Sequence, residues 1–199
     1  QNLYFIATQK TDTTVVFTAQ AAAGKTVEMA YQLGKNYMLH MQMRVKGMDG
    51  LFPANTTAMD VNWSDRCAQQ EKGFTFENRY ATLTYHEVQG GTDKLSETSE
   101  KINENISEQI DWVAFKNQFF SVVMIAKNKF EENSIMTSIP QEKDSGYLKQ
   151  YNAKMKTFLD PTGKEASEFE FYYGPNNFQI LQKAQKESTF GKDLEMTHL

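Results

Sequence analysis

The densest aromatic stretch of the 199-residue chain is Asp111-Trp112-Val113-Ala114-Phe115-Lys116-Asn117-Gln118-Phe119-Phe120. Strongly apolar residues continue from it as far as Ala126. Aromatic and branched residues favour strands, and so many large apolar side chains in sequence indicate burial. We therefore predict a central buried strand or strand pair here.

Stretches on either side alternate between apolar and polar residues, as a strand with one buried face does. In the clearest, Leu39, Met41, Met43 and Val45 alternate with His40, Gln42, Arg44 and Lys46. Residues 14–18 and 26–31 suggest a hairpin that turns through Ala23-Gly24-Lys25. Further strands are expected at 59–63, 82–86, 147–158 and 168–173. In the last, Phe169, Phe171 and Tyr173 should share one face, and Glu168, Glu170 and Tyr172 the other, wet face.

Three segments depart from this alternation. Residues 93–108 are polar and charged, and we expect an exposed insertion or loop with some helix. Residues 130–144 suggest looser structure. After Gly174 the spacing of Phe178 and Leu181 predicts a short amphipathic helix, which starts with Pro175 in its first turn and runs to about Lys186. The expected fold is all-β and mainly antiparallel: a sandwich over residues 1–174 and a helical segment over 175–199 of the same domain.

Composition excludes several classes of protein. The net charge of −4 argues against a nucleic-acid-binding face, which is usually basic. The single cysteine, Cys67, rules out an intrachain disulfide and a metal site built on several thiolates. The longest strongly apolar run, residues 119–126, is far shorter than the roughly 20 residues of a membrane-spanning helix. With no initiator Met and no signal-like start, we expect the chain to be the water-exposed part of a larger protein.

Few residues suggest chemistry. His40 and His86 fall on the polar faces of two expected strands, where neighbours could share a metal or exchange protons, although two solvated surface histidines are the commoner outcome. Glu168 and Glu170 point to one side of a strand, as two carboxylates that act together in acid–base chemistry would. Two residues on the solvent-exposed face of any amphipathic strand would have the same spacing. No nucleophile or phosphate-loop motif is present. We therefore expect no catalytic residue, no cofactor and no metal.

Several segments, in order along nearly the whole chain, resemble the large periplasmic domain of the YidC/Oxa/Alb insertase family. The strongest match is Trp112–Phe120. The others are Gln70-Glu71-Lys72-Gly73 with Arg79-Tyr80-Ala81, then Gly146-Tyr147-Leu148, Asp160-Pro161-Thr162-Gly163, Tyr173-Gly174-Pro175-Asn176 and Asp193-Leu194-Glu195-Met196.

This resemblance implies a β-supersandwich similar to galactose mutarotase, closed by C-terminal helical structure that lies toward the membrane. It implies a non-enzymatic role in inserting and folding membrane proteins, at the periplasmic face of the inner membrane of a Gram-negative bacterium. The implied partners are nascent inner-membrane proteins, Sec translocon components and the transmembrane core of the same protein. The family's domain normally begins earlier than this chain, so early strands are expected to be missing and a sandwich edge to be open.

The C-terminal helix is then the best candidate for contacts with partners, because it would lie nearest the membrane. The residues expected to make these contacts are Asn176, Asn177, Gln179, Gln182, Lys183 and Lys186. One alternative is a carbohydrate-binding or mutarotase-like sandwich that uses Tyr172 and Glu170, although His40, His86 and Glu170 do not align with the His–carboxylate pair of mutarotase chemistry. Another is a purely structural spacer.

Overall fold

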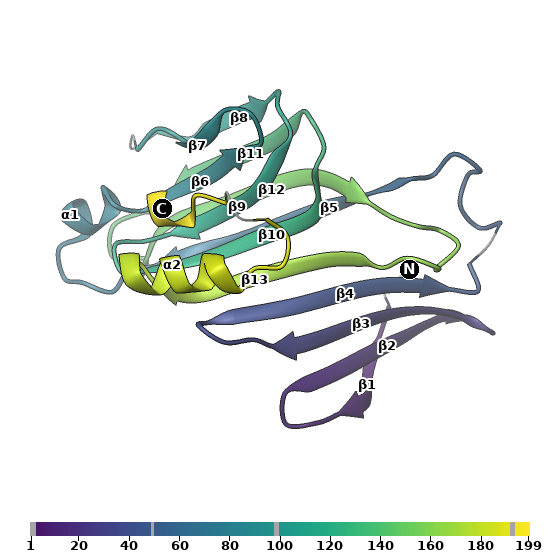
Figure 1. The fold of residues 1–199 in the computed structure, drawn as a ribbon. Helices are drawn as coiled ribbons and strands as arrows, with labels where there is room; N and C mark the ends of the chain where they lie inside the picture. Colours follow the sequence, from purple (N-terminus) through teal and green to yellow (C-terminus); the bar gives the residue numbers. More distant parts are fainter. Residues whose placement is uncertain (1–2, 49, 98–99, 192–193) are drawn as a thin grey trace.

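The computed structural model describes residues 3–48, 50–97, 100–191 and 194–199, which form two facing antiparallel sheets and little helix (Figure 1). The larger sheet has the order β1-β2-β3-β4-β13-β10-β9-β6-β7 and the smaller β5-β12-β11-β8. The strands of the larger sheet are β1 (Phe5–Lys10), β2 (Thr14–Ala22), β3 (Lys25–Leu33), β4 (Met38–Lys46), β13 (Ser167–Pro175), β10 (Phe120–Phe130), β9 (Ile110–Lys116), β6 (Thr82–Glu87) and β7 (Gly91–Lys94). Those of the smaller sheet are β5 (Ala58–Ala68), β12 (Tyr147–Phe158), β11 (Ser134–Pro140) and β8 (Ile102–Ile106). The helices are α1 (Phe74–Asn78), α2 (Phe178–Glu187) and the 3-10 turn η1 (Met196–His198). The all-β, antiparallel fold with a short C-terminal helix is confirmed.

β9 and β10 are the strand pair expected in the middle of the larger sheet, with Val113 opposite Met124. Val113 and Phe115 point into the interior between the sheets, whereas Trp112 and Ala114 point to the outer face. None of these four β9 side chains is more than 4% exposed. The apolar run is continuous because this part of the sheet is covered on both faces.

An aromatic stack joins the two sheets across the interior. The Phe115 ring lies 4.0 Å from the Trp63 ring of β5 and 5.2 Å from the Tyr151 ring of β12, centroid to centroid. Both pairs are close to parallel, an arrangement that adds to the apolar area they bury. The stack therefore fixes the smaller sheet over β9.

α2 and the segment after it cover the part of the larger sheet's outer face that β9, β10 and β13 form, and α2 lies in front of β13 and β10 in Figure 1. α2 starts one turn later than expected, because Pro175 ends β13 opposite Phe120 and is not in the helix. The Asn177 side chain then caps the helix by accepting the backbone N–H groups of Gln179 and Ile180, at 3.0 and 3.2 Å. The prediction that Pro175 lies in the first turn of the helix is therefore wrong.

The prediction that one face of β13 is exposed to solvent is also wrong. Glu170 and Tyr172 are both 0% exposed. The strand alternates as predicted, but α2 packs Leu181 and Ala184 onto this face and so excludes water from it. Only Glu168 keeps partial exposure, in an ion pair with Lys127 at 2.5 Å.

Two segments expected to be irregular hold strands. Residues 93–108 contain the end of β7 and all of β8, and residues 130–144 contain β11, which pairs with β8. Ile102 and Ile106 anchor β8 to the interior, while Asn103 and Asn105 hydrogen-bond with side chains on the outer face. Pairing to a partner strand is a nonlocal interaction, so local composition did not reveal it.

Phe115→Ala should lower the free energy of unfolding by about 3–5 kcal/mol, because it opens a cavity between the sheets. Phe120→Ala, four residues after the end of β9, should change it by less than about 1 kcal/mol, since Phe120 is 54% exposed. Urea unfolding followed by circular dichroism measures both. Equal losses in the two variants would contradict the assignment of Phe115 to the core.

Candidate functional site

The six residues expected to contact partners divide into two groups. Asn176 is bound inside the domain, where its side chain accepts the Ser121 hydroxyl at 2.6 Å and donates to the Asn117 carbonyl at 2.8 Å. Asn177 is the cap of α2. The remaining four are exposed on the helix surface opposite Leu181 and Ala184: Gln179, Gln182, Lys183 and Lys186.

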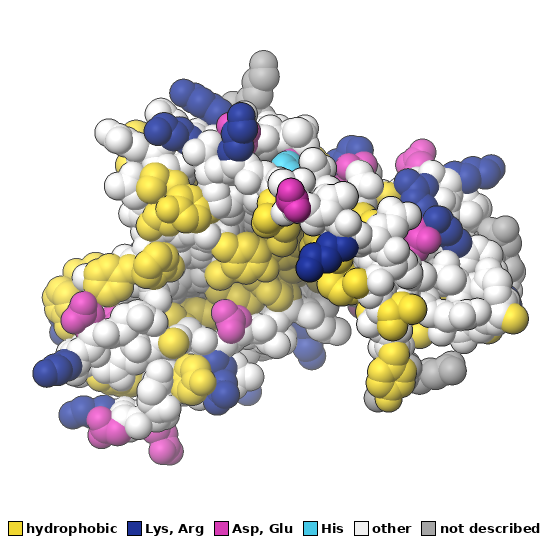
Figure 2. All heavy atoms as spheres, turned by 90° about the horizontal axis from the view of Figure 1, so that it is seen from below, with side chains coloured by type: hydrophobic (Ala, Val, Ile, Leu, Met, Phe, Trp, Pro, Cys, Tyr) yellow, Lys and Arg dark blue, Asp and Glu magenta, His cyan; other side chains and the backbone are white. Residues whose placement is uncertain are grey.

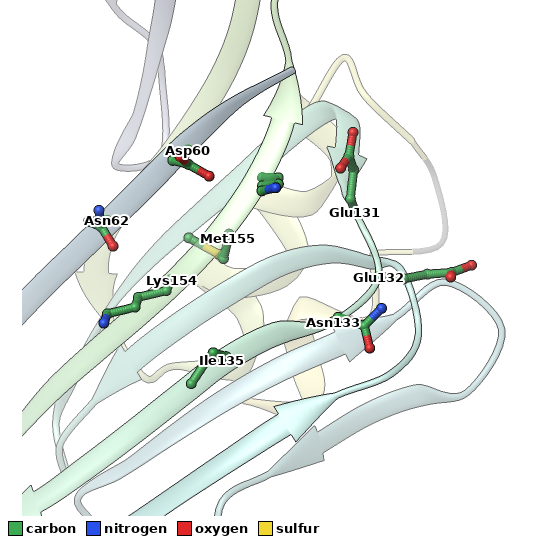
Figure 3. A pocket seen from close by; sticks show the side chains of 9 residues that line it. Asp60, Asn62, Glu131, Glu132, Asn133, Ile135, Lys154 and Met155 are labelled. Atoms are coloured by element: carbon green, nitrogen blue, oxygen red, sulfur yellow. The ribbon is translucent and has the colours of Figure 1, made fainter. Parts of the chain in front are cut away.

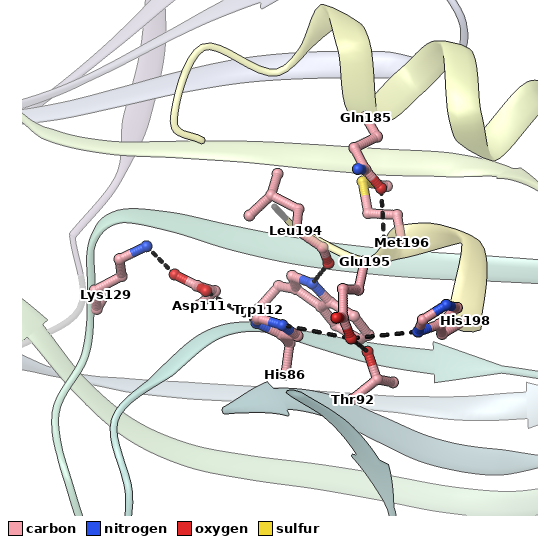
Figure 4. Close-up of polar contacts among 10 residues, drawn as sticks. All are labelled: His86, Thr92, Asp111, Trp112, Lys129, Gln185, Leu194, Glu195, Met196 and His198. Carbon is pink, nitrogen blue, oxygen red and sulfur yellow. Dashed lines mark hydrogen bonds and ion pairs between the residues drawn. The ribbon is translucent and has the colours of Figure 1, made fainter. Parts of the chain in front are cut away.

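A buried polar cluster lies between β6, β9 and the C-terminal segment (Figure 4). His86 is 5% exposed, with its Nδ1 atom 2.9 Å from Oδ2 of Asp111 and its ring stacked on Trp112 at 5.9 Å. Lys129 pairs with the other oxygen of Asp111. The expectation that His86 is a solvated surface residue is therefore wrong, because the C-terminal segment covers its strand.

Glu195 closes this cluster from the C-terminal side. Its carboxylate lies 3.8 Å from Nε2 of His86 and 3.2 Å from Nδ1 of His198, and it accepts the Thr92 hydroxyl at 3.3 Å. Beside it the Trp112 indole N–H donates to the Leu194 carbonyl at 2.5 Å. These contacts fasten the chain end across the outer face of the larger sheet.

The two carboxylates of this cluster favour their ionised forms. Burial alone would raise the pKa of Asp111, but hydrogen bonds from His86 and Lys129 outweigh it and hold the pKa below its ordinary value. The pKa of Glu195 is likewise lowered, because the hydrogen bond and charge of His198 outweigh desolvation. Sequence reasoning missed Asp111 and Glu195, which are 84 positions apart and carry no motif.

The paired carboxylates on β13 do not act together. Glu170 accepts the Ser188 hydroxyl at 2.5 Å and both the backbone N–H and the hydroxyl of Thr189, at 2.9 and 2.8 Å. His40 lies 3.2 Å from the same carboxylate, and β4 and β6, which carry the two histidines, are not neighbours. Glu168 is engaged separately with Lys127. Glu170 thus ties the end of α2 to the sheet.

A polar hollow of about 540 Å³ lies on the outer face of the smaller sheet (Figure 3). Its charged side chains are all exposed, and Figure 3 shows Glu131 and Glu132 on the turn before β11, apart from Asp60 on β5. The residues that line it are Asp60, Asn62, Glu131, Glu132, Asn133, Ile135, Lys154, Met155 and Lys156. Solvated charges of both signs give this hollow no defined chemistry. Across the described ranges, no cluster of three or more His, Cys, Asp or Glu side chains is placed to hold a metal ion.

Comparison with known proteins gives one consistent family. Residues 1–197 match the YidC periplasmic domain. The chain is 42% identical over 200 residues to a membrane protein insertase YidC of Phocaeicola vulgatus, covering 100% of this chain and 32% of that protein. A protein of the same name from Bacteroides fragilis is 41% identical over 187 residues, covering 94% and 30%, and one from Porphyromonas gingivalis is 30% identical over 200 residues, covering 100% and 32%. The chain thus spans about a third of the length of these relatives.

Asp111→Asn should lower the free energy of unfolding at pH 7, and this loss relative to the wild-type chain should shrink toward pH 3. The native pKa lies below the unfolded value of about 4, so the ionised carboxylate adds stability above that value, and this is lost as pH falls through the native pKa. Urea unfolding at both pH values measures the effect. Asp12→Asn, at an exposed carboxylate between β1 and β2, is the control, and a deficit independent of pH would contradict the prediction.

Cys67 should be nearly inert to disulfide reagents at pH 8 in the native chain. Burial, with the nearby charges of Glu77 and Asp65, raises the pKa of its thiol to about 12, so the reactive thiolate is roughly a thousandfold scarcer than in a free cysteine. Labelling kinetics, with Ser64→Cys as an exposed control on the same strand, measure this. Equal rates at positions 64 and 67 would refute it.

Proposed function

The chain belongs to the family of YidC periplasmic domains, and we propose that it is the periplasmic domain of an insertase that helps inner-membrane proteins insert and fold by non-covalent binding. It would act at the periplasmic face of the bacterial inner membrane. Its partners would be nascent inner-membrane proteins, Sec translocon components and the transmembrane core of its own polypeptide. Among the residues that the structure describes, no helix is both long and apolar enough to cross a bilayer.

The observation that carries this proposal is the family match along almost the whole chain, with relatives named as insertases. The polar clusters are consistent with it, since Glu170 accepts hydrogen bonds from Ser188 and Thr189, and His86 pairs with Glu195, so both clusters hold the C-terminal segment on the sheet. The carbohydrate alternative has weaker support, because Glu170 and Tyr172 are both 0% exposed.

The exposed row on α2 is the contact surface that we propose, formed by Gln179, Gln182, Lys183 and Lys186. The helix is fixed just before its start by the bonds of Asn176 with Ser121 and Asn117, and just beyond its end by the bonds from Ser188 and Thr189 to Glu170. A helix held at both ends presents its outer side chains in a defined geometry. Its two lysines suit a partner surface that carries acidic groups.

Photo-crosslinking in cells tests this surface in the full-length polypeptide. A crosslinking residue at Gln182 or Lys183 should capture translocon or membrane-core proteins. The control positions are Gln150 and Lys156, which are exposed on the opposite side of the sandwich. Lys183→Glu with Lys186→Glu should lower the crosslinking yield roughly 2- to 10-fold, as expected when two exposed ion pairs are lost.

Crosslinks confined to the control positions would exclude α2 as the contact surface. Normal insertion of membrane proteins after deletion of the whole domain would instead indicate a structural spacer and would contradict the proposed function. Wild-type crosslinking that falls with rising salt concentration would support the role of the lysines.

A further inference from the structure

Five exposed aromatic side chains gather at one end of the sandwich, which lies at the left in Figure 1. The segments that carry them are residues 34–37, 69–81, 117–120 and 175–178. The five side chains, each between 46% and 61% exposed, are Tyr37, Phe76, Tyr80, Phe120 and Phe178. We call this surface the aromatic end.

Backbone contacts hold these segments together. The Asn176 N–H donates to the Phe119 carbonyl at 2.7 Å, which joins the start of α2 to the start of β10. The Tyr173 N–H donates to the Tyr37 carbonyl at 3.0 Å, which joins β13 to the turn between β3 and β4. α1 precedes β6, whose first residue pairs with the last residue of β9. The aromatic rings therefore stand at fixed places on one end of the domain.

The exposed charges of the aromatic end are mostly positive. Lys35 is on the turn between β3 and β4, Lys72 and Arg79 lie on either side of α1, and Glu71 is the one exposed carboxylate of these segments. Glu77 is 0% exposed, and its carboxylate accepts backbone N–H groups inside the domain. The positive character is local, because the whole chain has a net charge of −4.

The adjoining turn between β11 and β12 has a different character. The Gln69 N–H donates to the Gly146 carbonyl at 3.0 Å, so this turn borders the aromatic end. It exposes Glu142, Lys143 and Asp144, and it contains no aromatic residue. The aromatic end is thus an apolar and cationic surface with a hydrated charged border, as in segments that lie in a membrane interface.

This combination of side chains suits the surface of a phospholipid bilayer. Aromatic rings favour the headgroup region, where they meet both apolar and hydrated surroundings. Lys and Arg side chains can lay their stems along apolar surface and keep their charges in water, at the level of the lipid phosphates. A bound peptide strand would instead need an open strand edge, whereas these rings stand on turns, on α1 and at the first residues of β10 and α2.

The surroundings of the aromatic end agree with a membrane as its partner. The relatives are named membrane protein insertases, and about two thirds of their length lies outside the segment that this chain matches. Figure 1 shows the C-terminus on the same side of the molecule as α1 and the start of α2. Figure 2 keeps this end at the left and shows hydrophobic side chains gathered there, with charged ones beside them.

We propose that the aromatic end binds the surface of a phospholipid bilayer that contains anionic lipids. Phe76, Tyr80 and Phe178 enter the headgroup region, and Lys72 and Arg79 contact lipid phosphates. The proposal rests on the proposed location of the domain at the inner membrane, and it adds a lipid contact to the protein contacts assigned to α2.

Flotation of the 199-residue chain with lipid vesicles tests the proposal. The chain should bind vesicles of phosphatidylethanolamine with phosphatidylglycerol, and bind vesicles of phosphatidylcholine more weakly. Phe76→Ser with Phe178→Ser should weaken binding roughly tenfold or more, because two rings no longer enter the interface. Leu51→Ser with Val88→Ser is the control, since both residues are exposed and apolar but lie outside the aromatic end, and it should bind like the wild-type chain.

A second variant tests the cations. Lys72→Gln with Arg79→Gln should weaken binding to the anionic vesicles roughly tenfold and leave binding to phosphatidylcholine vesicles unchanged. Rising salt concentration should weaken binding of the wild-type chain to the anionic vesicles. Circular dichroism verifies that each variant is folded, and this exposed pair keeps the proposal testable if the ring variant does not fold.

Lipid labelling extends the test to the full-length polypeptide. In vesicles of the anionic composition, a phospholipid with a photoreactive headgroup should label peptides that contain Tyr80 and Phe178, and should not label the peptide that contains Leu51. Mass spectrometry of the digested protein measures this.

Failure of the wild-type chain to float with anionic vesicles would overturn the proposal, and so would an equal loss of binding in the Leu51 and Val88 variant. Crosslinks from Tyr80 and Phe178 to a protein, with no lipid labelling there, would assign this end to a protein partner and overturn it too. Flotation reports on lipid alone, so missing protein crosslinks from Gln182 and Lys183 would contradict the proposed function without bearing on this result.

Discussion

The whole fold depends on burial of β9 on both faces. On the inner side Phe115 is stacked between Trp63 and Tyr151, which fixes the smaller sheet. On the outer side Trp112 lies beneath the C-terminal segment, to which its indole donates a hydrogen bond. A single strand thus holds three layers together, and burial of its alternating side chains contributes to two separate cores.

Carboxylates attach the short helical pieces to this framework, and all of them are buried except that of Glu195, whose side chain is 40% exposed. Glu170 accepts bonds from the turn after α2, Asp111 and Glu195 hold the chain end through His86, and Glu77 of α1 accepts the backbone N–H groups of Gln70 and Glu71. A buried charge is costly unless it is paired or fully hydrogen-bonded, and these are. Acidic and histidine side chains that suggest chemistry in the sequence therefore have a structural role in the fold.

This use of polar groups bears on function. The groups best suited to acid–base chemistry are occupied within the domain, while α2 keeps an exposed row of polar side chains. Such a row suits a domain that works through contacts with other segments and proteins, as the proposed accessory role in an insertase requires.

Local periodicity was enough to predict the β-rich class, the hairpin of β2 and β3, the alternation of β4 and the central pair β9–β10. Each of these features depends on residues that are close together in the sequence. The family resemblance, too, rests on short segments in order. Three predictions were wrong for one reason. They placed Glu170 and Tyr172 on a solvent-exposed face, His86 at the surface, and irregular structure around β8 and β11. Each depends on what packs or pairs from a distant part of the chain: α2, the segment at Leu194 to Met196, or a partner strand. Only the tertiary structure decides which polar side of a strand stays wet, because a covering layer is a long-range contact that local sequence does not encode.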